Sequence, residues 1–243
     1  MISKNQLKLI NSLAQKKYRR KHNLFLVQGE KNVLELLQSS FELHQLFATE
    51  DFYQRHSQAL KHQHCVITTS EFLQKAGTLQ SNDSVLALVK SPDATAPTIS
   101  GSELTLVLDG VSDPGNLGTI IRLADWYGIK QVIASEDCAD CFNPKVISAS
   151  MGSFARVHIH YTGLAEFLSL QSMPVYGAFL EGENLHCAEL SPQGFIVLGS
   201  ESHGIRPEVA RYVNRKITIP NFGQAESLNV AMAGAIILDN FKR

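Results

Sequence analysis

The chain has 243 residues, a length that allows one large domain or two smaller ones. Hydrophobic residues make up 44% of it and charged residues 19%, as in ordinary soluble globular proteins, and the formal net charge of −1 excludes a protein that is basic as a whole. The charge is uneven, however. Residues 1–29 contain seven Lys and Arg residues and no Asp or Glu, so this part of the chain can attract a polyanion.

The sequence favours a cytoplasmic protein. No run approaches the roughly 18 uninterrupted apolar residues of a membrane span, and the N-terminal stretch MISKNQLKLI has no long apolar region of the kind found in secretory signals. The four cysteines are therefore expected to stay reduced. Cys138 and Cys141 form a Cys-x-x-Cys pair, but no second Cys or His pair accompanies it, so we expect no metal site.

The first part of the chain predicts a small α/β domain over residues 1–92. Residues 4–20 place apolar side chains at helical spacing and predict one basic amphipathic helix. Short β-rich runs then alternate with helical patterns. The expected strands are Leu24–Val27, Leu43–Thr49, Cys65–Thr68 and Val85–Val89, and the expected helices are Glu30–Gln38, Asp51–Leu60 and Ser70–Ala76. Ser91–Ser102 predicts a linker, since it is rich in Pro, Ala, Thr and Ser and lacks apolar periodicity.

Residues 103–243 predict a second α/β domain. Short apolar strands separated by helices indicate a parallel sheet covered on both faces. The expected strands are Leu104–Leu108, Lys130–Ala134, Arg156–His160, Val175–Phe179, Phe195–Leu198 and Lys216–Ile219. The expected helices are Gly118–Tyr127, Pro144–Met151, Gly163–Leu170, Pro207–Val213 and Ser227–Phe241. The fold class is therefore α/β, in two domains.

The first of three motifs in this half is DGVSDPGNLGTIIR, from Asp109 to Arg122. A strand ends, a Pro-Gly turn follows, and a helix is expected to start near Asn116 as its cap. The carboxyl ends of strands beside helix starts are where α/β domains bind ligands. Turn chemistry with a surface arginine explains the same residues when the motif is taken alone.

The second motif is FIVLGSESHGIRP, from Phe195 to Pro207. An apolar strand leads into a loop with two glycines, Gly199 and Gly204, which allow close backbone approach. The loop also carries the acid Glu201. A plain strand-to-helix loop with a solvated glutamate is the competing interpretation.

The third motif, ITIPNFGQAESLNVAMAGAIILDN, runs from Ile217 to Asn240. A short strand is followed by a polar loop and a helix expected from Ser227. Glu226, Ser227 and Asn229 lie at or near its start, where polar side chains can satisfy free backbone N–H groups. The helix is rich in Ala and Gly, which indicates that another segment approaches its backbone closely. A tightly packed terminal helix is the alternative.

Two common nucleotide-binding signatures are missing. The 16 glycines include no Gly-x-Gly, so the dinucleotide fingerprint is absent, and there is no Gly-x-x-x-x-Gly-Lys-Ser/Thr loop. A nucleotide-like cofactor would need another loop architecture.

Taken together and in this order, the three motifs resemble those of the SpoU-type (TrmH-like) RNA 2′-O-ribose methyltransferases of the SPOUT superfamily. The matching residues are Asn116-Leu117-Gly118 with Arg122, Leu198-Gly199-Ser200-Glu201 with Gly204, and Ile219-Pro220 with Ser227-Leu228-Asn229-Val230. Two positions depart from the pattern: Ser202 stands where many relatives have Gly, and Ala231 where many have Ser. The N-terminal part, with Lys17-Tyr18-Arg19 and Phe25–Glu30, is similar to the family's ribosomal-protein-like substrate-binding domain.

The resemblance implies a trefoil-knotted catalytic domain at residues 103–243 and an RNA-binding domain at residues 1–92. A knot would explain the small residues of the last helix, because a threaded chain needs close backbone passage. The implied cofactor is S-adenosylmethionine, held by the loops of the second and third motifs. The positions carried over for cofactor binding are Leu198, Gly199, Ile219, Pro220 and Leu228. The family's members are homodimers with the active site near the subunit interface.

The resemblance also implies the catalytic residues, Asn116, Arg122, Glu201, Ser227 and Asn229. A ribose hydroxyl is a weak nucleophile that needs activation. Because arginine stays protonated, we expect Arg122 to act as a fixed cation that positions an RNA phosphate and stabilises the developing alkoxide. Asn229 is expected to bond the ribose or hold Arg122, and Ser227 to cap the last helix while facing the substrate. For Glu201, a structural and a catalytic role stay equally open.

The basic N-terminal stretch is expected to contact RNA phosphates through Lys16, Lys17, Arg19 and Arg20. A solvated helix face is the commoner explanation of such a charge run. The resemblance implies ribosomal or transfer RNA as the substrate, and the attached N-terminal domain favours ribosomal RNA. Two alternatives are a non-catalytic RNA-binding module with the same fold and a methyltransferase with another acceptor.

Overall fold

The computed structural model describes residues 3–93, 95–99 and 101–243. Its contacts divide the chain into two compact units. The N-terminal unit contains the chain up to Asp93 and also Asp140–Ala155, whereas the C-terminal unit contains Ala94–Ala139 and Arg156–Arg243. Among the described residues, no helix has the length and apolar character needed to cross a bilayer.

The N-terminal unit is a four-stranded mixed sheet with helices on both faces. The strands are β1 (Leu24–Gln28), β2 (Leu43–Ala48), β3 (Cys65–Ile67) and β4 (Val85–Lys90), in the order β1-β4-β2-β3. The central strand β4 is antiparallel to β1 and β2, and β2 is parallel to β3. The helices are α1 (Lys4–Ser12), α2 (Lys16–His22), α3 (Glu30–Leu37), α4 (Glu50–Arg55), α5 (Ser57–Leu60), α6 (Ser70–Lys75) and α8 (Pro144–Ser150), with a 3₁₀ turn at Ser153–Ala155.

Alternation along the strands builds a core on each face of this sheet. Phe25 and Val27 of β1 belong to one cluster, and Leu24 and Leu26 belong to the other. The first cluster also takes in Ile147 and Phe154 with Phe142, and the Phe142 ring stacks on Phe25 with centroids 4.3 Å apart. Residues 140–155 therefore complete the core of the N-terminal unit.

The single helix expected over residues 4–20 is wrong, because the chain breaks between α1 and α2. Ser3 caps α1 in a capping box with Gln6. The break frees the carbonyls of Leu13 and Ala14, and both accept hydrogen bonds from Nη1 of Arg19, at 2.8 and 3.0 Å. The same guanidinium reaches a carboxylate oxygen of Asp140 at 2.5 Å.

Replacing Arg19 by alanine is expected to lower the free energy of unfolding by roughly 3 kcal/mol, since a partly buried carboxylate and two carbonyls would be left without their partner. Arg19 is only 4% exposed. Thermal or urea unfolding of the variant measures the effect. Arg20→Ala is the matched control, because Arg20 is exposed and its removal should change stability by about 0.5 kcal/mol or less. Equal effects of the two variants would contradict the structural role of Arg19.

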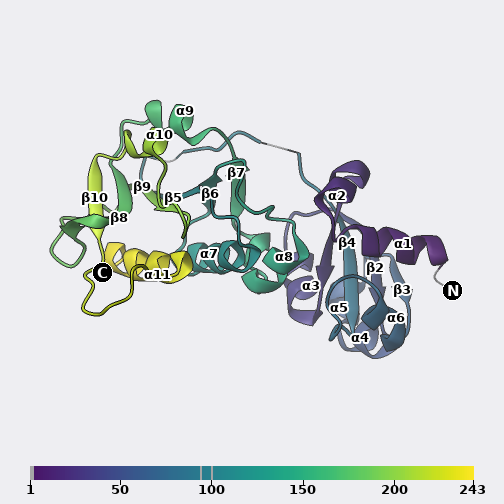
Figure 1. Ribbon diagram of the computed structural model, residues 1–243. Coiled ribbons are helices and arrows are strands. Elements are labelled where there is room, and N and C mark those ends of the chain that lie inside the picture. Colours follow the sequence, from purple (N-terminus) through teal and green to yellow (C-terminus); the bar gives the residue numbers. More distant parts are fainter. Residues whose placement is uncertain (1–2, 94, 100) are drawn as a thin grey trace. The chain divides into compact units, whose positions relative to one another are not determined.

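The C-terminal unit is a six-stranded sheet in the order β10-β8-β9-β5-β6-β7, with every neighbouring pair parallel. Figure 1 shows α9 and α10 on one face of this sheet and α7 and α11 on the other. The α/β class and the covered parallel sheet expected from the sequence are confirmed. The strands are β5 (Leu104–Asp109), β6 (Gln131–Ala134), β7 (His158–Tyr161), β8 (Val175–Asn184), β9 (Gly194–Gly199) and β10 (Arg215–Thr218). The helices are α7 (Pro114–Trp126), α9 (Leu164–Ser169), α10 (Pro207–Ala210) and α11 (Val230–Phe241).

Two helix starts differ from expectation. Helix α7 begins at Pro114 rather than near Asn116, because Asp113 is the cap and its carboxylate accepts the Asn116 N–H at 2.8 Å. Helix α11 begins at Val230 rather than Ser227, because Asn229 is the cap. Asn116 and Ser227 are therefore not helix caps.

Strand β8 is longer than expected and does not pair evenly with β10. Lys216 lies opposite Gly177, but the next residue, Ile217, lies opposite Glu183. Residues 178–182 of β8 therefore leave the ladder, and a Cβ on Gly182 would come within 2.8 Å of the Lys216 carbonyl oxygen. This excursion passes close over the backbone of β10.

Candidate functional site

The three motifs converge at one edge of the C-terminal sheet. Strands β5, β9 and β10 lie in one parallel sheet, so their carboxyl ends share an edge, which is where α/β domains bind ligands. The first motif follows β5, the second follows β9 and the third follows β10.

One hydrogen-bonded cluster joins a side chain from each motif. The Nδ2 groups of Asn116 and Asn229 both donate to Oε1 of Glu201, at 3.0 and 2.6 Å. Nδ2 of Asn229 also lies 2.9 Å from Oδ1 of Asn116. The Glu201 carboxylate therefore links the first turn of α7 to the cap of α11.

Local structure fixes each member of this cluster. Asn229 uses Oδ1 to cap its own helix, accepting from Ala231 N at 3.1 Å, which leaves Nδ2 to bond Glu201. Asn116 lies in the first turn of α7. Glu201 follows Ser200 in a tight turn, where Ser200 and Gly204 exchange backbone hydrogen bonds of 3.1 and 2.8 Å.

A cavity of about 1000 Å³ lies beside this cluster. Its walls are the excursion of β8, the end of β9 with the Glu201 turn, the end of β10 and the loop before α11. All five positions expected to bind the cofactor line it, and Glu201 and Ser227 line it too. The five are Leu198, Gly199, Ile219, Pro220 and Leu228.

The lining fits S-adenosylmethionine by its chemistry. Leu198, Ile219 and Leu228 would offer apolar surface to an adenine ring, and Glu201 and Glu226 would offer negative charge to a sulfonium cation. The loops that line the cavity also offer backbone N–H and C=O groups, although the chain has no Gly-x-Gly loop. No group of three or more potential metal ligands occurs in the part of the chain that the structure describes.

A second, smaller cavity of about 120 Å³ adjoins the cluster. It shares Ser200, Glu201, Ser202 and Val230 with the larger cavity and is otherwise lined by the first motif, including Asn116. The Glu201 turn thus forms a common wall of two cavities. Ser202, a departure from the family pattern, contributes to that wall.

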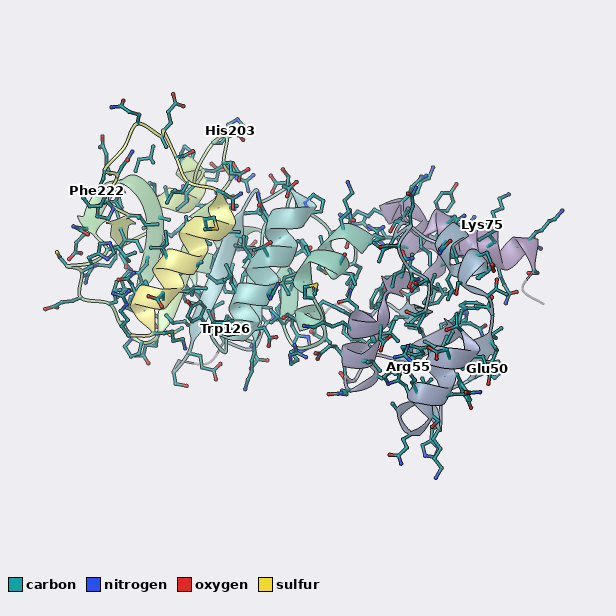
Figure 2. All side chains as sticks on the ribbon, turned by 90° about the horizontal axis from the view of Figure 1, so that it is seen from below. Glu50, Arg55, Lys75, Trp126, His203 and Phe222 are labelled. Atoms are coloured by element: carbon teal, nitrogen blue, oxygen red, sulfur yellow. The ribbon has the colours of Figure 1, made fainter. Side chains whose placement is uncertain are left out.

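The structure does not bring Arg122 into this cluster. Arg122 is exposed on α7 and lines neither described cavity. Within the described residues its guanidinium has no hydrogen bond or ion pair. One turn further on the same face lies Trp126, which is 83% exposed, and Figure 2 shows it far from His203 and Phe222, which border the larger cavity.

Among the four basic residues expected to contact RNA, Arg19 is buried and bonded within its own unit, so its assignment is corrected to a structural one. Lys16, Lys17 and Arg20 are exposed on α2. The ammonium of Lys17 lies 4.8 Å from the centre of the Tyr18 ring. A basic surface with an adjoining aromatic ring remains on this helix.

Sequence reasoning missed two residues that shape the site, Asp109 and Arg206. Nε of Arg206 donates to Asp109 at 2.7 Å, and its Nη groups reach Asp137 at 3.3 Å. Hydrogen bonding to Asp109 raises the pKa of the Arg206 guanidinium, and a hydrogen bond from Ser135 lowers the pKa of the Asp137 carboxyl. An aspartate at the end of a buried strand, such as Asp109, indicates that a cationic partner lies nearby. Nothing in the local sequence identifies Arg206 as that partner.

Comparison with known proteins decides the family. The model of the SpoU rRNA Methylase family matches residues 103–239, and that of the MRM3-like substrate binding domain matches residues 4–87. The chain belongs to the SpoU rRNA methylase family. The prediction of an S-adenosylmethionine-dependent RNA 2′-O-ribose methyltransferase is thereby confirmed at the level of the family.

Similar proteins cover the whole chain. A solved structure assigned to the RNA methyltransferases of the TrmH family, from Porphyromonas gingivalis, is 38% identical with a TM-score of 0.87 and covers 100% of this chain and 98% of its own. An AdoMet-bound rRNA methyltransferase from Sinorhizobium meliloti is 25% identical with a TM-score of 0.87, covering 99% and 96%. The 23S rRNA (guanosine(2553)-2′-O)-methyltransferase RlmP of Bacillus subtilis is 29% identical over 97% of this chain and 96% of its own length.

Proposed function

We propose that this SpoU family member transfers a methyl group from S-adenosylmethionine to a ribose 2′-hydroxyl of ribosomal RNA, in the cytoplasm. The observation that carries the proposal is the cluster of Asn116, Glu201 and Asn229 between a large cavity suited to the cofactor and a small one. RlmP, which acts on 23S rRNA by name, aligns over nearly the whole chain. Residues 103–243 carry the chemistry, and residues 1–92 bind RNA.

The chemistry needs a positioned hydroxyl and a stabilised negative charge. S-adenosylmethionine, when bound, supplies an electrophilic methyl group. Asn229 and Ser227 face the attacking ribose from the third motif, and Glu201 holds Asn116 and Asn229 in register. The guanidinium of Arg122 stabilises the developing alkoxide and positions an adjacent phosphate. The proton passes to phosphate or water, because Arg122 stays protonated.

The active enzyme is a homodimer, and Arg122 acts in the partner's site. Its place on the exposed face of α7, away from both cavities of its own chain, supports this arrangement. Trp126 and Met232 leave apolar surface exposed, 83% and 59%, on α7 and its packing neighbour α11, which suits contact with a second copy.

Mixed dimers test this arrangement. Arg122→Ala and Asn229→Ala chains, each inactive alone, are expected to regain up to roughly half of the wild-type turnover per heterodimer, because one of its two sites is then fully native. Differently tagged chains, co-expressed and purified as heterodimers, provide the sample for a methyl-transfer assay. If the heterodimers are inactive, Arg122 and Asn229 of each active site come from the same chain.

The catalytic domain contains a trefoil knot formed where β10 passes the excursion of β8. The six-residue jump in pairing between Gly177 and Glu183 supports it. So does the close passage of Gly182 over Lys216, as well as Gly234 of α11, whose added Cβ would lie 3.1 Å from Leu198. Small residues in α11 allow this helix to pack close to the end of β9, as a threaded chain requires.

Neutralising Lys16, Lys17 and Arg20 together is expected to weaken RNA binding and to flatten its salt dependence. For every phosphate that the protein no longer neutralises, the log–log salt slope should fall in magnitude by roughly 0.7–0.9. Binding of a ribosomal RNA fragment at several salt concentrations measures the slope. The matched control neutralises Lys31, Lys61 and Lys75, three exposed lysines of the same unit. If both triple variants bind the RNA fragment with the same affinity and salt slope, Lys16, Lys17 and Arg20 have no specific role in RNA binding.

Calorimetric titration with S-adenosylmethionine, followed by methyl transfer to ribosomal and transfer RNA, tests the function as a whole. Binding of the cofactor and labelling of ribosomal RNA are expected. A folded protein that does not bind the cofactor would instead be a non-catalytic RNA-binding module, and labelling of transfer RNA alone would change the substrate.

A further inference from the structure

A buried carboxylate connects the first motif to the far end of the second. Asp109 is the last residue of β5, and its side chain is 0% exposed. Its Oδ2 accepts the backbone N–H of Arg206 at 2.7 Å, and its Oδ1 accepts Nε of the same residue at 2.7 Å. Arg206 directly precedes Pro207, the first residue of α10. Asp109 therefore fixes both the backbone and the side chain at the point where the second motif ends.

The turn that carries Glu201 is the short segment between the end of β9 and Arg206. It leaves β9 at Gly199, where an added Cβ would lie only 2.1 Å from the Gly204 carbonyl carbon. Residues 201–204 are exposed. The turn is anchored by β9 on one side and by Asp109 through Arg206 on the other. Ser200 and Gly204 also pair through their backbones, the His203 N–H donates to Ser200 Oγ at 3.2 Å, and Ile205 is buried. The bonds of Glu201 to Asn116 and Asn229 depend on where these contacts place the turn.

Glu201 is the residue whose position depends on these anchors. Its carboxylate meets Asn116 and Asn229 and lines both cavities. A displaced turn would break two hydrogen bonds of the cluster and change the common wall of the cavities. Misplacement by about 1 Å can lower a reaction rate roughly 100-fold.

We propose that the Asp109–Arg206 pair is a positioning device that holds Glu201 in register with Asn116 and Asn229 and so fixes the wall between cofactor and acceptor. The pair touches neither reactant and is not catalytic. This inference rests on the proposed methyl transfer, but its structural part, the order of the Glu201 turn, is measured without it.

Arg206→Ala is expected to lower kcat roughly 10–100-fold and to weaken S-adenosylmethionine binding several-fold, with the KM for RNA nearly unchanged. Arg206→Lys should recover part of the activity, because its ammonium can still reach the Asp109 carboxylate, whereas both variants keep the backbone N–H. Arg211→Ala is the matched control, since Arg211 is an exposed arginine at the opposite end of α10 and its Nε donates to the Glu208 carbonyl.

Two further measurements separate positioning from general stability. In a Glu201→Ala background, Arg206→Ala should cost less than about 2-fold in kcat, because the residue that it positions is already gone. Hydrogen exchange should show the Ser200 and Gly204 amides exchanging at least about 10-fold faster in Arg206→Ala than in wild type, because their paired hydrogen bonds open more often. If Arg206→Ala does not fold, Asp109→Asn, which keeps an acceptor for the backbone N–H, carries the same comparisons.

The proposal is overturned if Arg206→Ala keeps wild-type kcat and wild-type exchange, or if its effect on kcat is undiminished in the Glu201→Ala background. Failure of the proposed function is recognised separately: the wild-type protein would then neither bind S-adenosylmethionine nor methylate RNA, whereas the exchange rates would still show whether Arg206 orders the turn.

Discussion

Arg122→Ala is expected to lower kcat for methyl transfer by roughly 100–1000-fold, the usual cost of removing a fixed group that stabilises developing negative charge. Cofactor affinity and stability should stay at wild-type values. Arg122 lines neither cavity, and within the described residues its guanidinium has no partner that the substitution would leave unpaired. Single-turnover assays with saturating RNA and S-adenosylmethionine measure the effect.

Arg122→Lys distinguishes charge from shape. If the residue acts as a fixed cation, lysine should retain measurable turnover, reduced because an ammonium lacks the planar fork that holds a phosphate through two hydrogen bonds. Complete inactivity, with RNA and cofactor binding intact, would instead require a role that only guanidinium fills. An Arg122→Ala enzyme with near wild-type kcat would remove this residue from the mechanism.

Gly199→Ala is expected to weaken the binding of S-adenosylmethionine. The added methyl group would lie 2.1–2.3 Å from backbone atoms of Gly204 and Ile205, so the Glu201 turn must move. Overpacking of this kind costs about 1–3 kcal/mol. Because the displaced turn forms part of the cavity wall, we expect this free energy to be lost from cofactor binding, so that the Kd for S-adenosylmethionine rises roughly 10–100-fold. Calorimetric titration of the folded variant measures it.

Gly223→Ala provides the matched control for this substitution. Gly223 lies in the third-motif loop, and its added Cβ would approach only Oδ1 of Asn221, at 3.9 Å. Its effect on cofactor binding should be several-fold at most. Similar effects of both substitutions would show that any added methyl group near this cavity is harmful, and would contradict the specific closeness of the Glu201 turn.

The sequence was sufficient for the parts of the site that depend on the order of elements. Parallel strands separated by helices place the ends of β5, β9 and β10 at one edge, so residues far apart in the chain, such as Asn116, Glu201 and Asn229, could be expected together. The helix starts were misplaced by two or three residues. Asp113 lies three residues before Asn116, and Asn229 two residues after Ser227; all four are residue types that favour caps, so only the observed backbone selects between them.

Other features depend on long-range packing that local patterns do not contain. Arg19 stands in a run of basic residues and is identical in type to its exposed neighbour Arg20, yet it is buried against Asp140. Residues 140–155 fall inside the part of the chain matched by the SpoU family model, yet they complete the core of the N-terminal unit. The jump in pairing between β8 and β10 has no periodicity that would reveal it.

This chain is expected to methylate a ribose in ribosomal RNA at the site where Asn116, Glu201 and Asn229 meet. Mapping of ribose methylation in total RNA, in cells with the protein, without it, and with Asn229→Ala restored in its place, tests it most directly. At least one methylated position in ribosomal RNA is expected to disappear without the protein, to return with the wild-type chain and to stay absent with Asn229→Ala. An unchanged methylation map, or full restoration by the Asn229→Ala chain, would contradict the claim.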